Sequence, residues 1–157
     1  TESPHGRSQG SFGDGVTEQH DVEAAIEFAK ARNLPNLWLV GWSFGTELAI
    51  KYGSDKDVVG AILLSPPLHR ANDLDLDRWV GNHRSLIALV PEFDDYLQPV
   101  EATQRFAKIS HAEIIGVDGA KHLWVGEAAT KRVLDEIVRQ VSPENYPLPD
   151  AWTPVAK

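Results

Sequence analysis

Three side chains in this sequence could carry out nucleophilic catalysis together. Ser43 lies in the segment G-W-S-F-G at residues 41–45, while Asp94 and His122 each follow a later apolar segment. A serine hydroxyl is a poor nucleophile near neutral pH, so it needs an imidazole to accept its proton. The imidazole needs a carboxylate that fixes its tautomer and stabilises its charged form. Ser43, His122 and Asp94 supply these groups, and the neighbouring Asp95 is an alternative acid.

The glycines around Ser43 have the spacing of a nucleophile elbow, G-x-S-x-G, which is a sharp turn from a strand into a helix. Such a turn strains the serine backbone and crowds its neighbours, so we expect side chains to be excluded at Gly41 and Gly45. The turn also points the Phe44 backbone N–H at the place where an oxyanion forms. The five-residue pattern alone also arises by chance, so the strand before it and the helix after it are needed to identify a nucleophile elbow.

Apolar segments alternate with helical patterns along the chain. We predict strands at 37–41, 58–65, 86–90 and 112–117. We predict helices from a cap at Thr17 or Asp21 to about Arg32, then at about 43–52, 100–109 and 127–141, with a short helix near 75–80. The strands are almost continuously apolar, which indicates an α/β fold with a parallel sheet covered by helices on both faces.

Functional residues in such folds gather at the carboxyl ends of the strands. Ser43, Asp94 and His122 follow the first, third and fourth predicted strands, so we expect them to meet at one sheet edge. Their order along the chain, serine then acid then histidine, is the order that accompanies the elbow motif.

With these motifs in place, the chain resembles the α/β-hydrolase superfamily from about Gly6 to Val141. The segment P-E-F-D at 91–94 is similar to the Gly-Glu-x-Asp acid loop except at its first residue, and G-A-K-H at 119–122 is similar to the histidine loop. The stretch at 7–13 is similar to a Gly-x-Ser-x-Gly loop that follows an earlier strand. The S-P-P segment at 65–67 and the lack of a long lid resemble small bacterial hydrolases, with dienelactone-hydrolase-like and prolyl-peptidase-like relatives.

The resemblance implies a carboxylesterase-like serine hydrolase that cleaves a small ester, thioester or amide. Ser43 would be the nucleophile, His122 the base and then the acid, Asp94 the group that orients His122, and the Phe44 N–H an oxyanion donor. No cofactor and no metal is implied. A lyase or haloperoxidase on the same scaffold is a further alternative.

The chain departs from the superfamily in one respect, because it has no room for the strands that usually precede the elbow. The second oxyanion donor normally follows one of those strands, and losing one donor costs about 10²–10³ in rate. The strand at 37–40 would be an exposed apolar edge that invites pairing, for example in a homodimer. Since the sequence begins with Thr1 rather than Met, we expect a processed chain or a fragment. A non-catalytic binding or assembly module is therefore the alternative function.

The aromatic residues beside the predicted site are candidates for a substrate pocket. Trp42 and Trp124 flank the site in sequence and are predicted to line an apolar surface for the acyl or alcohol group. Phe44 either joins that surface or points into the core. Arg70, after the second strand, either binds a substrate carboxylate or is a solvated surface residue.

Composition excludes several other classes of function. The 157 residues suit one domain over 1–157, with an extended loop at 1–16 and a proline-rich tail at 142–157. A net charge of -8 argues against a nucleic-acid or anionic-membrane partner and leaves a small molecule as the expected one. Cysteine is absent, histidines are scattered, and the acidic run at 73–77 has the wrong spacing for calcium, so we expect no metal site. No apolar run approaches a membrane span, and we expect a cytoplasmic protein.

Overall fold

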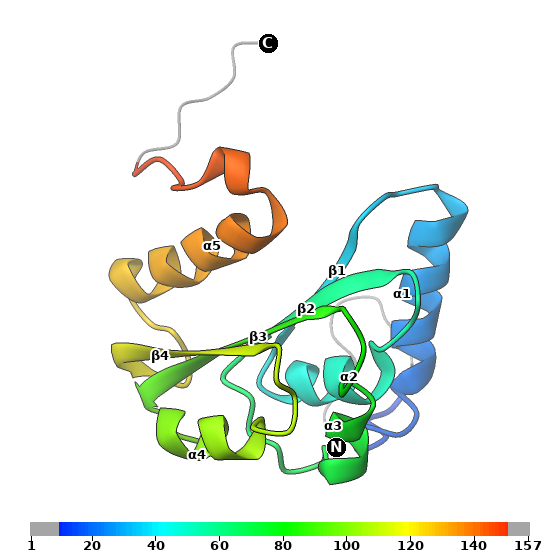
Figure 1. Ribbon diagram of the computed structural model, residues 1–157, viewed down its shortest axis with the longest axis horizontal. Coiled ribbons are helices and arrows are strands. Elements are labelled where there is room, and N and C mark those ends of the chain that lie inside the picture. The colour runs from blue at the N-terminus through cyan, green and yellow to red at the C-terminus, as the bar shows by residue number, and fades with distance from the viewer. Residues whose placement is uncertain (1–9, 151–157) are drawn as a thin grey trace. The chain divides into compact units, whose positions relative to one another are not determined.

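The computed structural model describes residues 10–150, and the predictions for residues 1–9 and 151–157 lie outside this range (Figure 1). Contacts divide the chain after Leu123 into two compact units, each described by itself below. The first unit holds four strands and four helices, and the second holds α5 (Glu127–Val141) and the short 3₁₀ helix η1 (Pro143–Asn145).

The four strands form one parallel sheet in the order β1-β2-β3-β4 (Figure 1). They are β1 (Leu37–Trp42), β2 (Val58–Leu64), β3 (Ser85–Phe93) and β4 (Ala112–Lys121). This confirms the predicted α/β fold class, in which a parallel sheet has helices around it. Since all four strands run the same way, their carboxyl ends lie at one edge of the sheet.

Strands β3 and β4 run beyond their predicted ends. Phe93 pairs with Lys121 past an irregularity between Pro91 and Phe93. A proline and several polar residues in this part of the sequence are typical of loops, which is why the pattern ended the strands too early. The extension matters because it carries the acid and histidine segments outward together.

The helices of the first unit are α1 (Gln19–Ala31), α2 (Phe44–Tyr52), α3 (Asp73–Asp77) and α4 (Pro99–Arg105). The prediction that Thr17 or Asp21 caps α1 is wrong, because Glu18 occupies the N-cap position. Its carboxylate accepts hydrogen bonds from the backbone N–H groups of Gly13 and Gly15, so the preceding loop folds back onto it. These bonds, led by the one from Gly13, lower the pKa of Glu18.

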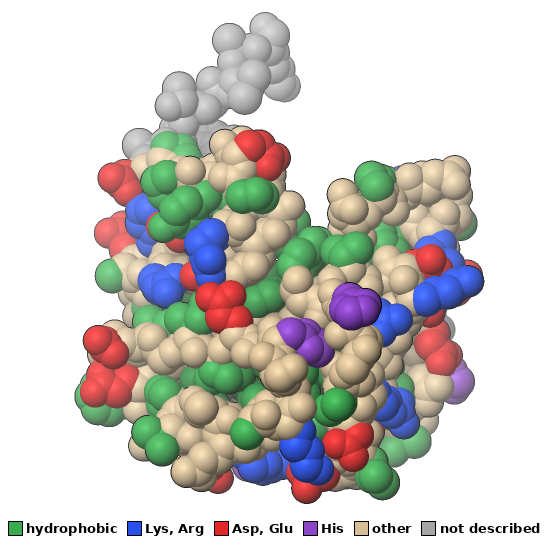
Figure 2. Space-filling view, viewed as in Figure 1, with side chains coloured by type: hydrophobic (Ala, Val, Ile, Leu, Met, Phe, Trp, Pro, Cys, Tyr) green, Lys and Arg blue, Asp and Glu red, His purple; other side chains and the backbone are tan. Residues whose placement is uncertain are grey.

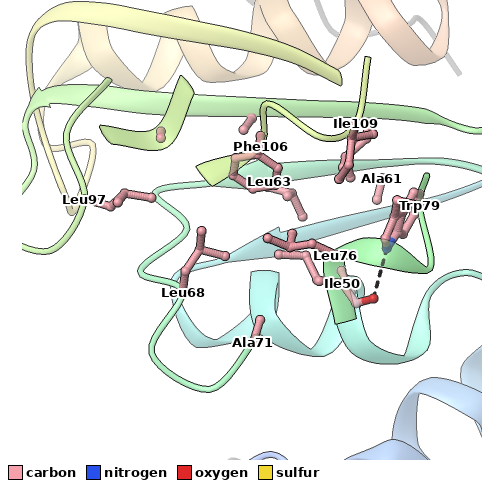
Figure 3. Close-up of a cluster of buried hydrophobic side chains, with 14 of the residues drawn as sticks. Ile50, Ala61, Leu63, Leu68, Ala71, Leu76, Trp79, Leu97, Phe106 and Ile109 are labelled. Carbon is pink, nitrogen blue, oxygen red and sulfur yellow. Dashed lines mark hydrogen bonds between the residues drawn. The ribbon is translucent and has the colours of Figure 1, made fainter. Parts of the chain in front are cut away.

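One buried cluster joins the sheet to α2, α3 and α4 (Figure 3). Its members include Ile50 from α2, Leu63 from β2, Leu76 from α3 and Phe106 after α4. Trp79 follows α3 and is fully buried in this cluster. Its indole N–H donates to the Ile50 carbonyl at 3.0 Å, so the large ring is buried without an unpaired donor.

The acidic run at 73–77 is not simply a solvated surface. Asn72 caps α3 in a capping box, in which Asp75 accepts the Asn72 backbone N–H at 3.0 Å. Asp75 is buried, whereas Asp77 is exposed and pairs with Lys108 at 3.5 Å. The run therefore starts a helix that contributes Leu76 to the core.

In the second unit, α5 has the bounds that its apolar pattern predicted. Its Glu136 is almost fully buried and accepts hydrogen bonds from Arg132, Arg139 and Gln140. Burial alone would raise the pKa of Glu136, but these bonds outweigh it and hold the pKa below its ordinary value.

Acidic and basic side chains are intermixed on the face in Figure 2 and do not gather into one basic patch. Across residues 10–150, none of the helices combines the length and apolar character needed to cross a lipid bilayer.

Candidate active site

Ser43 stands at the turn between β1 and α2, with φ 50° and ψ −118°. A non-glycine residue rarely adopts such a backbone, and strain of this kind concentrates at functional sites. A Cβ added at Gly41 would overlap Gly45 O and lie 2.6 Å from the Gly45 carbonyl carbon and 2.7 Å from Thr46 N. The steric prediction is thus confirmed for Gly41. It is wrong for Gly45, where an added Cβ meets nothing within 4 Å.

Ser43, His122 and Asp94 lie in one hydrogen-bonded chain. The distance from Ser43 Oγ to His122 Nε2 is 2.9 Å, and that from His122 Nδ1 to Asp94 Oδ2 is also 2.9 Å. Because an ionised carboxylate can only accept, Nδ1 carries the proton in that pair, and a neutral imidazole then accepts the serine hydroxyl at Nε2. The structure therefore brings together the three side chains that the sequence suggested, while their roles in catalysis stay predictions.

Asp94 is 3% exposed, and its second oxygen is also occupied. Oδ1 accepts the backbone N–H of Tyr96 at 2.8 Å and that of Leu97 at 3.3 Å. These bonds fix the orientation of the carboxylate. Asp95, the alternative acid, is exposed.

Tyr96 contributes a contact that the sequence analysis missed. Its ring meets the His122 ring in an edge-to-face arrangement with centroids 4.7 Å apart, and it meets the His69 ring in the same way at 5.2 Å. Its position two residues after Asp94 was the only feature of the sequence that could have indicated this contact. Half of Tyr96 is exposed, so it both packs against the imidazole and presents an aromatic surface beside it.

The backbone of the elbow supplies one donor for a developing negative charge. Phe44 is the first residue of α2, so its N–H has no partner within the helix. A helix N-terminus also favours a nearby negative charge. The hydrogen-bonded chain and this N–H are the groups predicted to act as nucleophile, base, orienting acid and oxyanion donor, and these roles stay predictions.

Trp42 makes a different contact from the one predicted. It is 49% exposed, so part of its ring can face a substrate, but its indole N–H donates to the His122 carbonyl at 3.1 Å. Trp124, the other predicted pocket residue, opens the second compact unit. Its carbonyl accepts the Thr130 hydroxyl at 3.3 Å, and its role at a pocket stays a prediction.

Arg70 is exposed, as the surface interpretation expects, but its guanidinium also forms ion pairs within the protein. It pairs with Asp14 at 2.5 Å and with the fully buried Glu47 at 3.7 Å, and it lies near the rings of Phe12 and Phe44. The hydrogen bond to Asp14, followed by the nearby charges, raises the pKa of Arg70. Phe44 is half-buried, and its ring meets the Phe12 ring with centroids 5.2 Å apart.

The arrangement of the sheet and elbow matches known structures. A structure of an α/β serine hydrolase homologue from Coxiella burnetii aligns with a TM-score of 0.74 and 21% identity, over 88% of this chain and 65% of that one. The fold is that of the α/β hydrolases. A putative α/β hydrolase from Agrobacterium tumefaciens aligns with a TM-score of 0.72 and 19% identity, over 92% of this chain and 70% of that one.

A lidless serine hydrolase from Xanthomonas campestris aligns with a TM-score of 0.65 and 20% identity, over 94% of this chain and 64% of that one. The chain thus spans about two thirds of the length of these α/β-hydrolase structures. No protein-family profile and no curated protein sequence matches it.

Proposed function

We propose that this α/β-hydrolase chain carries the catalytic centre of a serine hydrolase that cleaves a small carboxylic ester, thioester or amide. The observation that carries the proposal is the continuous chain from Ser43 Oγ through His122 to Asp94, with both hydrogen bonds at 2.9 Å. Ser43 also has φ 50° at the turn from a strand into a helix, which is the place and the backbone expected of a nucleophile elbow.

In the proposed first step, Ser43 Oγ attacks the substrate carbonyl carbon while its proton passes to His122 Nε2. The carbonyl oxygen takes up the electron pair of the broken π bond and faces the Phe44 N–H. Asp94 stabilises the imidazolium that forms. When the tetrahedral intermediate collapses, the bond to the leaving group breaks and that group takes the proton from Nε2, which leaves an acyl-serine.

In the second step, water attacks the acyl carbon and His122 accepts a proton from it. The acid product then leaves, and the proton returns from Nε2 to Ser43 Oγ. Each step is an acyl transfer. Half-exposed Trp42 and Tyr96 supply aromatic surface beside the reacting atoms, which favours an apolar acyl or alcohol group over a highly charged one.

A burst assay with p-nitrophenyl acetate tests the proposal on the full-length protein. An acyl-enzyme mechanism predicts a rapid release of about one nitrophenolate per active site when deacylation is slower than acylation. Ser43→Ala should abolish both the burst and the turnover, whereas His20→Ala, which removes an exposed histidine of α1, should change neither. Turnover that survives Ser43→Ala would reject the mechanism. An unsubstituted protein that is folded but shows no turnover would favour a non-catalytic binding module.

A further inference from the structure

The backbone carbonyl of His122 accepts hydrogen bonds from two side chains. Trp42 Nε1–H donates at 3.1 Å and Ser65 Oγ–H donates at 3.0 Å. A carbonyl oxygen has two lone pairs, so both bonds can form at once. Trp42 ends β1 and Ser65 follows β2, whereas His122 follows β4, so the two bonds tie the histidine segment to the other side of the sheet.

Burial makes this carbonyl dependent on its two donors. Ser65 is 1% exposed and His122 is 8% exposed. A buried acceptor that loses its donors keeps the cost of its lost hydration, so the main chain at His122 would move to find another partner. Any such movement carries the imidazole with it.

The backbone of Ser65 adds a separate argument. Its φ is 51°, in the left-handed region, where glycine fits without the penalty of a Cβ. Its N–H donates to the Leu89 carbonyl at 2.9 Å, so the backbone is held while the hydroxyl points at His122. A serine in this strained position supplies what glycine does not, namely the hydroxyl donor.

We propose that Ser65 and Trp42 are positioning residues that clamp the His122 carbonyl and so hold the imidazole between Ser43 and Asp94. The proposal rests on the proposed function. Trp42 directly precedes Ser43 in the chain, so its bond fixes the backbone of the base to the strand that carries the nucleophile. Misplacement of a catalytic group by about 1 Å can cost about 10²-fold in rate, which is why two bonds on one carbonyl matter to turnover.

The clamp makes predictions that a pocket role for Trp42 does not. Trp42→Phe keeps an aromatic ring but removes the N–H, and Ser65→Ala removes the hydroxyl. We expect each to lower kcat about three- to tenfold with little change in KM, since one donor remains on the carbonyl. The double variant should lose at least the product of the two single effects, about 10- to 100-fold, because no donor remains.

Two further variants serve as matched controls. Trp79→Phe also removes an indole N–H bonded to a backbone carbonyl, but in the core beneath the sheet, so it should lower Tm and leave kcat within about twofold. Ser65→Gly removes the hydroxyl and relieves the positive φ, so it should lose kcat like Ser65→Ala while unfolding at a higher temperature than Ser65→Ala.

The experiment measures kcat and KM for p-nitrophenyl acetate, Tm, and the downfield proton signal of the His122 Nδ1–H by NMR. The clamp predicts that this signal broadens in the double variant while the fold persists. Wild-type kcat in Ser65→Gly, or a raised KM with unchanged kcat in Trp42→Phe, would overturn the clamp. These outcomes differ from failure of the proposed function, in which the wild-type protein itself shows no Ser43-dependent turnover. Since Trp42 is half-exposed, its variant remains informative even if Ser65→Ala does not fold.

Discussion

The two glycines of the elbow should respond in opposite ways to the same added methyl group. At Gly41 the new Cβ would overlap Gly45 O and lie 2.7 Å from Thr46 N, all of them backbone atoms that cannot rotate away. Ordinary contact distances are at least about half an ångström longer, so the strand or the helix must move. Overpacking of this kind costs about 1–3 kcal/mol.

At Gly45 the methyl group enters open space on helix α2. Alanine in a helix is more stable than glycine by about 0.5–1 kcal/mol, because the unfolded chain loses less entropy on folding. We therefore expect Gly45→Ala to match or exceed the wild-type stability, and Gly41→Ala to lie about 1.5–4 kcal/mol below Gly45→Ala.

Urea unfolding followed by circular dichroism measures this difference, with the slope of the transition checking that both variants unfold in the same way. A third variant, Gly81→Ala, measures the cost of a positive φ in the absence of crowding, since Gly81 has φ 74° and open space around it. Equal destabilisation by Gly41→Ala and Gly45→Ala would refute the asymmetry of the elbow described above.

Three other predictions concern the acid, the second unit and the sheet edge. Asp94→Asn should keep the fold but lower kcat by up to about 10⁴, because the imidazole loses the charge that fixes its tautomer; steady-state kinetics checks this. Glu136→Gln should destabilise the protein at pH 7. Because the folded-state pKa of Glu136 is lowered, its contribution is complete above the unfolded pKa of about 4.3 and is lost as pH falls through the folded pKa, so unfolding curves of the two proteins should converge in acid. We also propose that the β1 edge pairs two copies of this chain. Val40→Lys, at an exposed residue of β1, should then shift the mass measured by light scattering from dimer to monomer, and a monomeric unsubstituted protein would contradict the proposal.

The sequence predicted the sheet well because its strands are rich in apolar residues, most of all the mostly buried central strands β2 and β3. The same rule failed where a strand contains polar residues, as at the ends of β3 and β4. The burial of Trp79 could not be predicted for a related reason, since its ring lies in a polar stretch and local pattern does not report burial.

The three predicted site residues could be found because each occupies a strand exit with a recognisable motif. The contacts that hold them could not. Ser65 and His122 are 57 positions apart, and Trp42 and His122 are 80 apart, so no local spacing links them. The pairing of Arg70 with Asp14 likewise joins distant segments, which is why the sequence did not predict it.

The central claim is that the Ser43 hydroxyl is an activated nucleophile, and covalent labelling tests it most directly. A fluorophosphonate probe reacts only with a serine whose proton is removed by a neighbouring base. The full-length protein should incorporate one probe, mapped by peptide mass spectrometry to Ser43, and His122→Ala should slow labelling by at least about 10²-fold. Labelling that persists in Ser43→Ala, or no labelling of the folded unsubstituted protein, would contradict the assignment of Ser43 as an activated nucleophile.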